Sequence, residues 1–134
     1  MASGNTESRP LSPHLSMWRW HPTMLSSILH RVSGIVNYLG AVALTVWLVL
    51  LASGAEGGVE ILTTGSLAWL TRIGLILLTW SASYHFLNGI RHLCWDMGWG
   101  FDPKGSNRRS VLIIFAAFIP TGVIWGLALT GGAS

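Results

Sequence analysis

The chain has 134 residues, of which 51% are hydrophobic and only 10% are charged, and its mean hydropathy is +0.53. Soluble domains carry about one quarter charged residues, so this composition excludes an ordinary soluble domain and predicts an all-α membrane protein. The formal net charge is +3, but the basic residues flank apolar runs, so no nucleic-acid partner is expected. The single cysteine, Cys94, excludes an internal disulfide, a Cys-x-x-Cys-His haem attachment and an iron–sulfur cluster.

The first part of the chain is polar. Residues 1–25 are expected to form a cytoplasmic N-terminal segment without a core of its own, with Trp18 and Trp20 at the level of the lipid headgroups. The segment lacks the apolar stretch of a signal peptide, so no cleavage is expected. The whole chain, residues 1–134, is therefore predicted to be one membrane-anchor domain.

Three apolar runs follow, each long enough for the roughly 20 residues that cross a ~30 Å hydrocarbon core. They predict three transmembrane helices, at about residues 29–52, 66–95 and 108–130. Three helices enclose little interior, so much of their surface is expected to face lipid or another subunit.

Local signals predict where these helices end. Ser26 or Ser27 is expected to cap the first helix, and the glycines between residues 54 and 58 are expected to turn the chain after it. Pro120 is expected to kink the third helix.

The charges predict the orientation. The loop between the first two spans carries Glu56 and Glu60, whereas basic residues gather before the first span and between the last two. The positive-inside rule therefore places the N-terminus in the cytoplasm and the C-terminus on the periplasmic side. The basic residues form a cytoplasmic collar suited to anionic headgroups or a docked partner: Arg9, Arg19, Arg31, Arg91, Lys104, Arg108 and Arg109.

Ser27 and Arg31 lie one turn apart at the start of the first helix and face the same way. A hydroxyl and a permanent cation at the membrane boundary could hold a quinone, because a reduced quinone oxygen gains negative charge. The alternative is that Ser27 is an ordinary cap and Arg31 an ordinary positive-inside anchor.

His85 lies deep in the second span, where an ionisable side chain is expensive to bury. His92 lies seven residues on, within about 20° of the same helix face, and Gly89 between them leaves room for a flat group. This face predicts a non-covalent haem b, with His85 ligating iron while His92 and Arg91 pair with propionates at the water boundary. In the alternative, His85 hydrogen-bonds a neighbouring helix and Gly89 only permits close packing.

His85 is the only histidine deep in a span. A haem with two axial histidines therefore needs its second ligand from another subunit. His30, at the cytoplasmic edge of the first helix, is expected to point toward the edge of that haem.

Three motifs resemble those of one family: RPLSPHL at residues 9–15, SxxHRxSG at residues 27–34 and HxxxGIRHLxWD at residues 85–96. They are similar to the succinate dehydrogenase cytochrome b556 subunits, the first membrane-anchor subunits of complex II. The likeness covers the whole chain. Trp18 stands where relatives often carry tyrosine, and Ser33 where many carry threonine.

The resemblance implies that His85 is one axial ligand of haem b and that a second anchor subunit, packed against this one, supplies the other. It implies that Ser27 and Arg31 line the ubiquinone site. His30 and His92 would border the haem propionates, with Arg31 close by.

The resemblance also implies an assembly. The chain would belong to a succinate:ubiquinone oxidoreductase with an iron–sulfur subunit and a flavoprotein subunit, and would carry no dicarboxylate chemistry itself. The first motif is closest to the alphaproteobacterial and mitochondrial branch. Without a transit-like leader, a bacterial inner membrane is expected rather than a mitochondrial one.

Three other functions compete with this interpretation. An anchor of a quinol:fumarate reductase would use the same motifs in the reverse direction. A structural anchor without haem would keep His85 for packing and Arg31 for topology. A small transporter would need a polar path across the membrane, and the polar residues of the spans look scattered: Asn37, Thr45, Thr79 and Asn88.

Overall fold

The computed structural model describes residues 17–131, so the expectations for the motif at residues 9–15 lie outside the described residues. This part of the chain forms five helices and no strand, which confirms the all-α fold class. The helices are α1 (Pro22–Ala52), α2 (Glu56–Thr63), α3 (Ala68–Asp96), α4 (Pro103–Ala116) and α5 (Phe118–Gly131).

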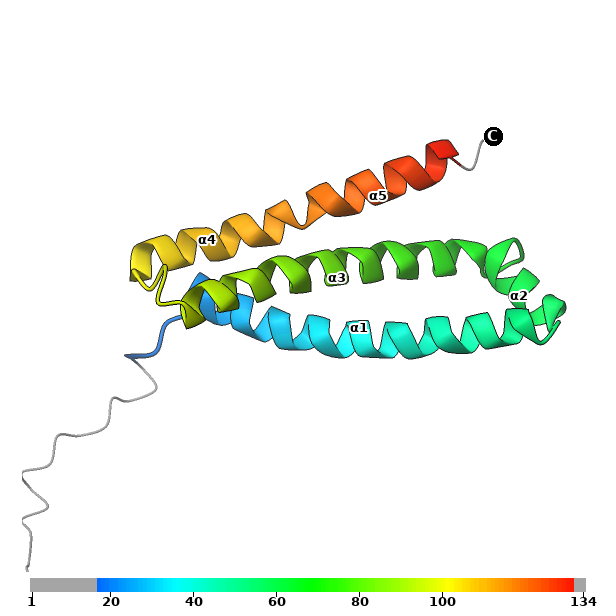
Figure 1. The fold of residues 1–134 in the computed structure, drawn as a ribbon, viewed down its shortest axis with the longest axis horizontal. Helices are drawn as coiled ribbons and strands as arrows, with labels where there is room; N and C mark the ends of the chain where they lie inside the picture. The colour runs from blue at the N-terminus through cyan, green and yellow to red at the C-terminus, as the bar shows by residue number, and fades with distance from the viewer. Residues whose placement is uncertain (1–16, 132–134) are drawn as a thin grey trace, which may run out of the picture.

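The long helices form three rods (Figure 1). α1 and α3 run antiparallel, while α4 and α5 continue one another along the other side of α3. α2 is a short connector at one end of the bundle. The start of α1 and the loop from α3 to α4 lie together at the opposite end.

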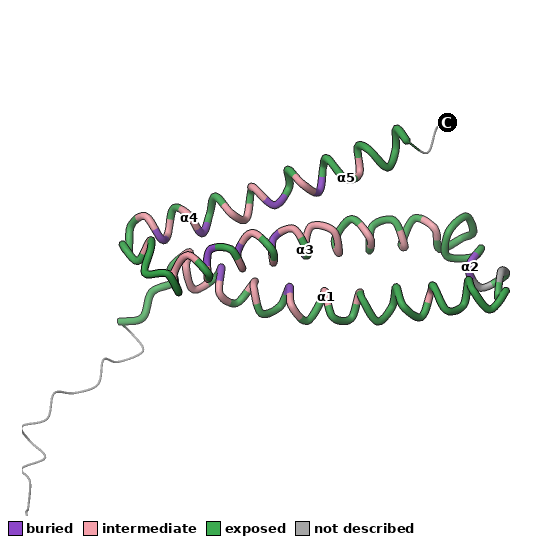
Figure 2. Tube along the Cα trace, viewed as in Figure 1, coloured by how far each residue is buried: buried purple, intermediate pink, exposed green. Residues whose placement is uncertain are grey.

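Polar side chains fill the interior. Among the residues whose burial is described, the buried ones include only three that are apolar or aromatic, Val59, Tyr84 and Ala117. Most buried positions lie in the half of the bundle that contains the start of α1 and the end of α3 (Figure 2). The buried polar residues are Ser26, Ser33, Ser81, Asn88, Arg91, Ser106, Ser110 and Thr121.

Large apolar side chains cover the outside of every long helix; Tyr38 is 69% exposed and Leu129 is 72% exposed. Exposing this much apolar surface to water is energetically unfavourable, whereas exposing it to hydrocarbon is not. Two rods are apolar and long enough to cross a membrane, namely α1 and the combined segment Pro103–Gly131. α3 has 29 residues, but its buried polar residues lower its hydropathy.

α1 begins earlier than expected. It starts at Pro22, with His21 as its N-cap, and not at Ser26 or Ser27. Proline suits the first helical position because the missing N–H would have no partner there. Residues 22–25, expected in the coreless N-terminal segment, are therefore helical, and Ser26 is fully buried instead of capping the helix.

The connection after α1 also differs from the expected glycine turn, because it contains the eight-residue helix α2. α3 agrees with the expected 66–95 to within two residues. It ends at Asp96, and Gly98, two residues beyond, has a φ of +83°. There the N–H groups of Gly98 and Trp99 donate to the carbonyls of Trp95 and Cys94, a helix stop that favours glycine.

The third rod begins at Pro103 and not at residue 108, because Asp102 caps it by accepting a hydrogen bond from the Gly105 N–H at 2.7 Å. The predicted kink is confirmed, since the helix breaks at Ala117 between α4 and α5. Pro120 has no N–H for the carbonyl of Ala116, and its ring crowds that group.

Candidate functional site

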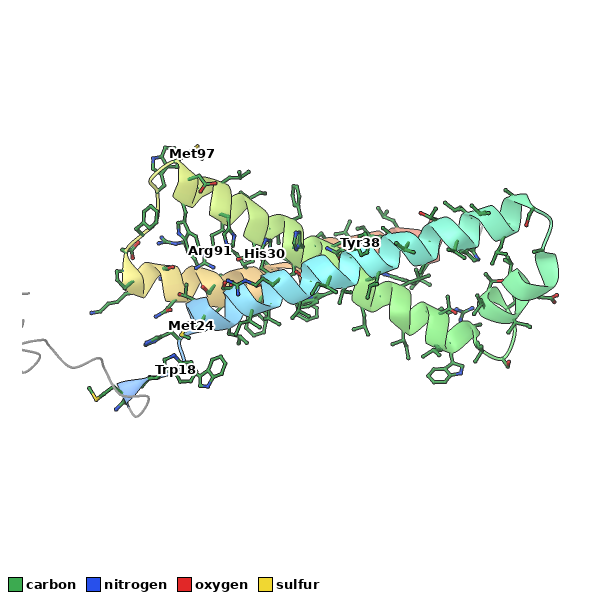
Figure 3. The ribbon with its side chains drawn as sticks, turned by 90° about the horizontal axis from the view of Figure 1, so that it is seen from below. Trp18, Met24, His30, Tyr38, Arg91 and Met97 are labelled. Atoms are coloured by element: carbon green, nitrogen blue, oxygen red, sulfur yellow. The ribbon has the colours of Figure 1, made fainter. Side chains whose placement is uncertain are left out.

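Three histidines that are far apart in sequence stack on one another at the end of the bundle where α1 begins. The ring of His30 on α1 lies 4.0 Å from that of His85, with 13° between the planes. The same ring lies 4.8 Å from that of His92, with 20° between the planes. Figure 3 shows His30 on α1, on the same side of the molecule as the end of α3. The structure thus brings together three histidines that belong to two separate sequence motifs.

The ring of His85 rests on α1. Its Nδ1 lies 3.0 Å from Ser33 Oγ and 3.2 Å from the backbone oxygen of His30. Its Cε1 lies so near Gly34 that a Cβ there would come within 3.1 Å of it. His85 therefore does bond a neighbouring helix, as the packing alternative proposed, but through one nitrogen only.

The other nitrogen of His85, Nε2, makes no hydrogen bond within residues 17–131. Beside the ring runs a groove of about 360 Å³, lined also by Asn37, Ala41 and Phe86 among others. Asn37 Oδ1 and His30 Nδ1 are buried without a hydrogen-bond partner. In the described part of the chain, the Nε2 atom makes no hydrogen bond and belongs to a ring that lines a groove, and two polar atoms nearby also lack partners. These features fit a haem whose iron is bound by His85.

Gly89 and His92 keep the same face open. A Cβ at Gly89 would meet no atom within 4 Å, so a flat group has room there. The Nδ1 of His92 lies 2.8 Å from the carbonyl oxygen of Asn88, and this bond orients the ring. Among the described residues, no group of three or more His, Cys, Asp or Glu side chains could hold a metal ion.

Arg91 lies elsewhere than expected. Only 6% of the residue is exposed, so it belongs neither to the water boundary nor to the basic collar. One guanidinium nitrogen donates to Ser26 Oγ at 3.1 Å and to Asn88 Oδ1 at 3.3 Å. The other donates to the hydroxyl and the carbonyl of Ser106, at 2.9 and 3.2 Å.

The guanidinium also lies 4.1 Å from the ring centroid of Trp95. These contacts tie α1, α3 and α4 together, and they leave Arg91 poorly placed to meet a propionate.

The two quinone candidates lie differently. Ser27 is half-buried and lines a pocket of about 250 Å³ together with Thr23, Met24, Arg91, His92 and Trp95. Arg31 is exposed and is not among the residues of that pocket. Within the described part of the chain, neither side chain makes a hydrogen bond, so both are available to a ligand.

The loop next to this pocket is closed by an exposed ion pair. Arg109 donates to Asp102 at 2.6 Å and to the carbonyl of Gly100 at 2.7 Å. The hydrogen bond from Arg109, followed by the one from the Gly105 N–H, lowers the pKa of Asp102. The carboxylate thus stays charged and keeps capping α4.

Sequence reasoning missed the buried polar network around Arg91. Its members on α3, Tyr84, Asn88 and Arg91, lie three or four residues apart on one helix face. Ser81, buried on the same face, donates to the Ser33 carbonyl instead. Ser26 donates to Asn88 Oδ1 at 3.0 Å, and the Tyr84 hydroxyl donates to the backbone oxygen of Ser26 at 2.8 Å. That spacing was the available signal, and Asn88, which looked scattered, belongs to an inward stripe.

Comparison with known proteins identifies relatives across most of the chain. The family model described as succinate dehydrogenase/fumarate reductase transmembrane subunit matches residues 5–124. The succinate dehydrogenase cytochrome b556 subunit of Rickettsia prowazekii is 31% identical over 117 residues, covering 87% of this chain and 90% of the relative. The protein of that name from Paracoccus denitrificans is 33% identical over 127 residues, covering 89% and 91%. The mitochondrial cytochrome b560 subunit of Sus scrofa is 32% identical over 111 residues, covering 80% and 64%.

Proposed function

The chain belongs to the succinate dehydrogenase/fumarate reductase transmembrane subunit family and is a membrane-anchor subunit of succinate dehydrogenase; we propose that it holds haem b jointly with a second anchor subunit and forms part of the ubiquinone-reducing site. Relatives named cytochrome b subunits support the haem. The observation that carries the proposal is the imidazole of His85, bonded to α1 through Nδ1 and free at Nε2.

For the haem, we assign His85 as the residue of this chain that would bind the iron. His30 and His92, stacked at the same place, border the group, and Gly89 leaves space beside it. When bound, haem b would supply a centre that accepts and returns one electron. Arg91 is not retained as a propionate partner, because its two terminal nitrogens serve the helix contacts and its Nε is buried.

For the quinone, we assign Ser27 and Arg31. Ser27 lines the pocket of about 250 Å³ and would donate a hydrogen bond from its hydroxyl to a quinone carbonyl. Arg31, one turn further along α1, would stabilise the negative charge that a quinone oxygen gains on reduction. Reduction to the quinol takes two electrons and two protons, and the electrons derive from succinate through partner subunits.

For the membrane, we propose three crossings, by α1, α3 and the α4–α5 rod. The start of α1 and the α3–α4 loop share one end of the bundle (Figure 1) and carry most of the basic residues, so that end is cytoplasmic. The exposed part of the collar there would meet the iron–sulfur subunit, which in turn carries the flavoprotein. Relatives from Rickettsia and Paracoccus favour a bacterial inner membrane.

Two functions from the sequence interpretation remain as alternatives. The family description includes fumarate reductase, so the direction of electron flow is set by the quinone and the partners and not by these residues. In a haem-less anchor, Nε2 of His85 would have no hydrogen-bond partner among residues 17–131.

The test uses the purified complex with the variants His85→Ala and Arg31→Ala. Arg72→Ala is the control arginine, because Arg72 lies near the start of α3, at the end of the bundle away from Arg31. We expect His85→Ala to lose the dithionite-reduced b-type spectrum. We expect Arg31→Ala to keep that spectrum and succinate oxidation by a soluble dye, but to reduce quinone about 10²–10³-fold more slowly, as when one charge-stabilising donor is removed. Parent-like quinone reduction and spectra in both variants would refute the assignments.

A further inference from the structure

We propose that Ser33 and Gly34 of α1 are positioning residues for His85, Ser33 by setting the tautomer of its imidazole and Gly34 by making room for the ring. This inference rests on the proposed role of His85 as a haem ligand. The two residues end the SxxHRxSG motif, and neither contacts the quinone pocket assigned to Ser27.

The hydrogen bonds around Nδ1 of His85 determine which nitrogen carries the proton. Ser33 Oγ donates to the backbone oxygen of His30 at 2.9 Å, so its hydroxyl proton is engaged and the oxygen can accept. The backbone oxygen of His30, 3.2 Å from the same Nδ1, can only accept. An unprotonated Nδ1 would point its lone pair at that oxygen.

Nδ1 therefore carries the proton and donates it to Ser33 Oγ and the His30 carbonyl. In a neutral imidazole the other nitrogen, Nε2, then holds a lone pair, which is the state that binds iron. Histidine ligands of metals are commonly oriented in this way by a hydrogen bond to the second nitrogen, which also raises the basicity of the ligand.

Gly34 places the ring. A Cβ at this position would lie 3.1 Å from Cε1 and 3.7 Å from Nδ1 of His85, so even alanine would press the ring away by a few tenths of an ångström. The ring cannot yield freely, because its Nδ1 is bonded to the adjacent residue, Ser33. His30, stacked on a face of the same ring, also limits its movement.

Two consequences follow for a haem held by His85. Loss of the Ser33 hydroxyl weakens the polarisation of the imidazole, so the iron(III) state is less stabilised and the midpoint potential rises. Crowding at Gly34 tilts the ring, so haem occupancy falls and the low-spin spectrum changes. Neither effect requires any change in the quinone pocket.

The experiment compares Ser33→Ala, Ser33→Cys, Ser33→Thr and Gly34→Ala in the purified complex. Ser83→Ala is the serine control, because Ser83 donates to the carbonyl of Thr79 on its own helix and accepts a 3.5 Å hydrogen bond from Thr121, and neither bond involves His85. Gly74→Ala is the glycine control, because its Cβ would meet nothing within 4 Å. The readouts are haem per complex, the visible and EPR spectra, and the potential from a redox titration.

We expect the potential to rise in Ser33→Ala, to rise less in Ser33→Cys, and to stay at the parent value in Ser33→Thr, which keeps the hydroxyl. We expect Gly34→Ala to lose haem and shift the EPR signal, while both controls match the parent. If the Ser33→Ala complex does not assemble, comparing Ser33→Cys with Ser33→Thr still tests the inference. A serine that only supports the fold would leave the midpoint potential the same in both variants.

Parent-like potentials in both Ser33→Ala and Ser33→Cys would overturn the inference and leave the haem assignment standing, provided that His85→Ala loses the b-type spectrum. A His85→Ala complex with an unchanged spectrum would instead overturn the proposed function itself. The two failures are thus distinguishable.

Discussion

Arg91 is a buried cation for which the described residues supply no carboxylate; the only ion pair among them joins Arg109 and Asp102. Its charge is instead stabilised by neutral oxygens on three helices and by the face of Trp95. Such an arrangement is costly to break, because these buried oxygens lose a charged donor and the Ser106 hydroxyl keeps no other hydrogen bond within the described residues. The sequence alone could not distinguish Arg91 from an arginine at the membrane–water boundary, because the next residue, His92, was expected at that boundary.

Replacing Arg91 tests whether it joins the helices. Arg91→Met should lower the stability of the complex by about 1–3 kcal/mol, the cost of leaving buried polar groups unsatisfied. Arg91→Lys should lose nearly as much, because one ammonium cannot reach both Ser26 and Ser106 as the guanidinium fork does. Thermal unfolding of the purified complex in detergent measures both. A lysine variant as stable as the parent would show that only the charge matters.

At the scale of helices, α1 and α3 approach closely through glycines of α1. Gly34 faces His85, and Gly40 faces Leu78, whose side chain would clash with a Cβ at that position. Small residues at such contacts allow the backbones of membrane helices to pack. The sequence predicted the long helices well, because apolar runs of this length have few other solutions in a membrane. It missed α2, which lies outside the apolar runs, and it misplaced the starts of α1 and α4, which local caps decide.

The glycine contact leads to a paired prediction. Gly40→Ala should destabilise the complex by about 1–3 kcal/mol, because the added methyl overpacks against Leu78 and must displace it. Gly74→Ala adds the same methyl where nothing lies within 4 Å, so it should be neutral or slightly stabilising, as alanine favours helix. Thermal unfolding with haem retention as a second readout compares the two. Equal stability of both variants would mean that Leu78 moves aside at no cost.

At the scale of the whole molecule, the polar interior and apolar exterior are the reverse of those in a soluble protein. The buried polar residues lie mostly toward the end where α1 begins (Figure 2). His30, whose ring stacks on those of His85 and His92, lies toward the same end (Figure 3). The apolar exterior agrees with a subunit surrounded by lipid and by partner helices.

The proposed orientation can be tested with single cysteines. In a Cys94→Ser background, a cysteine replacing Thr64, beside α2, should react with a membrane-impermeant maleimide in intact spheroplasts. A cysteine replacing Lys104, at the α3–α4 loop, should react only after the membrane is solubilised. Both positions are exposed in this chain. Labelling in the reverse order would place the N-terminus outside and remove the basis for a cytoplasmic partner on the collar.

The sequence alone determined the class of protein, the long helices and the residue types suited to haem and quinone, because hydropathy, helix length and motif chemistry are local properties. Tertiary structure decided which of those residues meet. His30 stacks on His85, Ser33 bonds its Nδ1, and Arg91 turns inward while Arg31 stays exposed. These outcomes depend on the rotation and register of helices distant in sequence, which interhelical packing sets and which no single run of residues encodes.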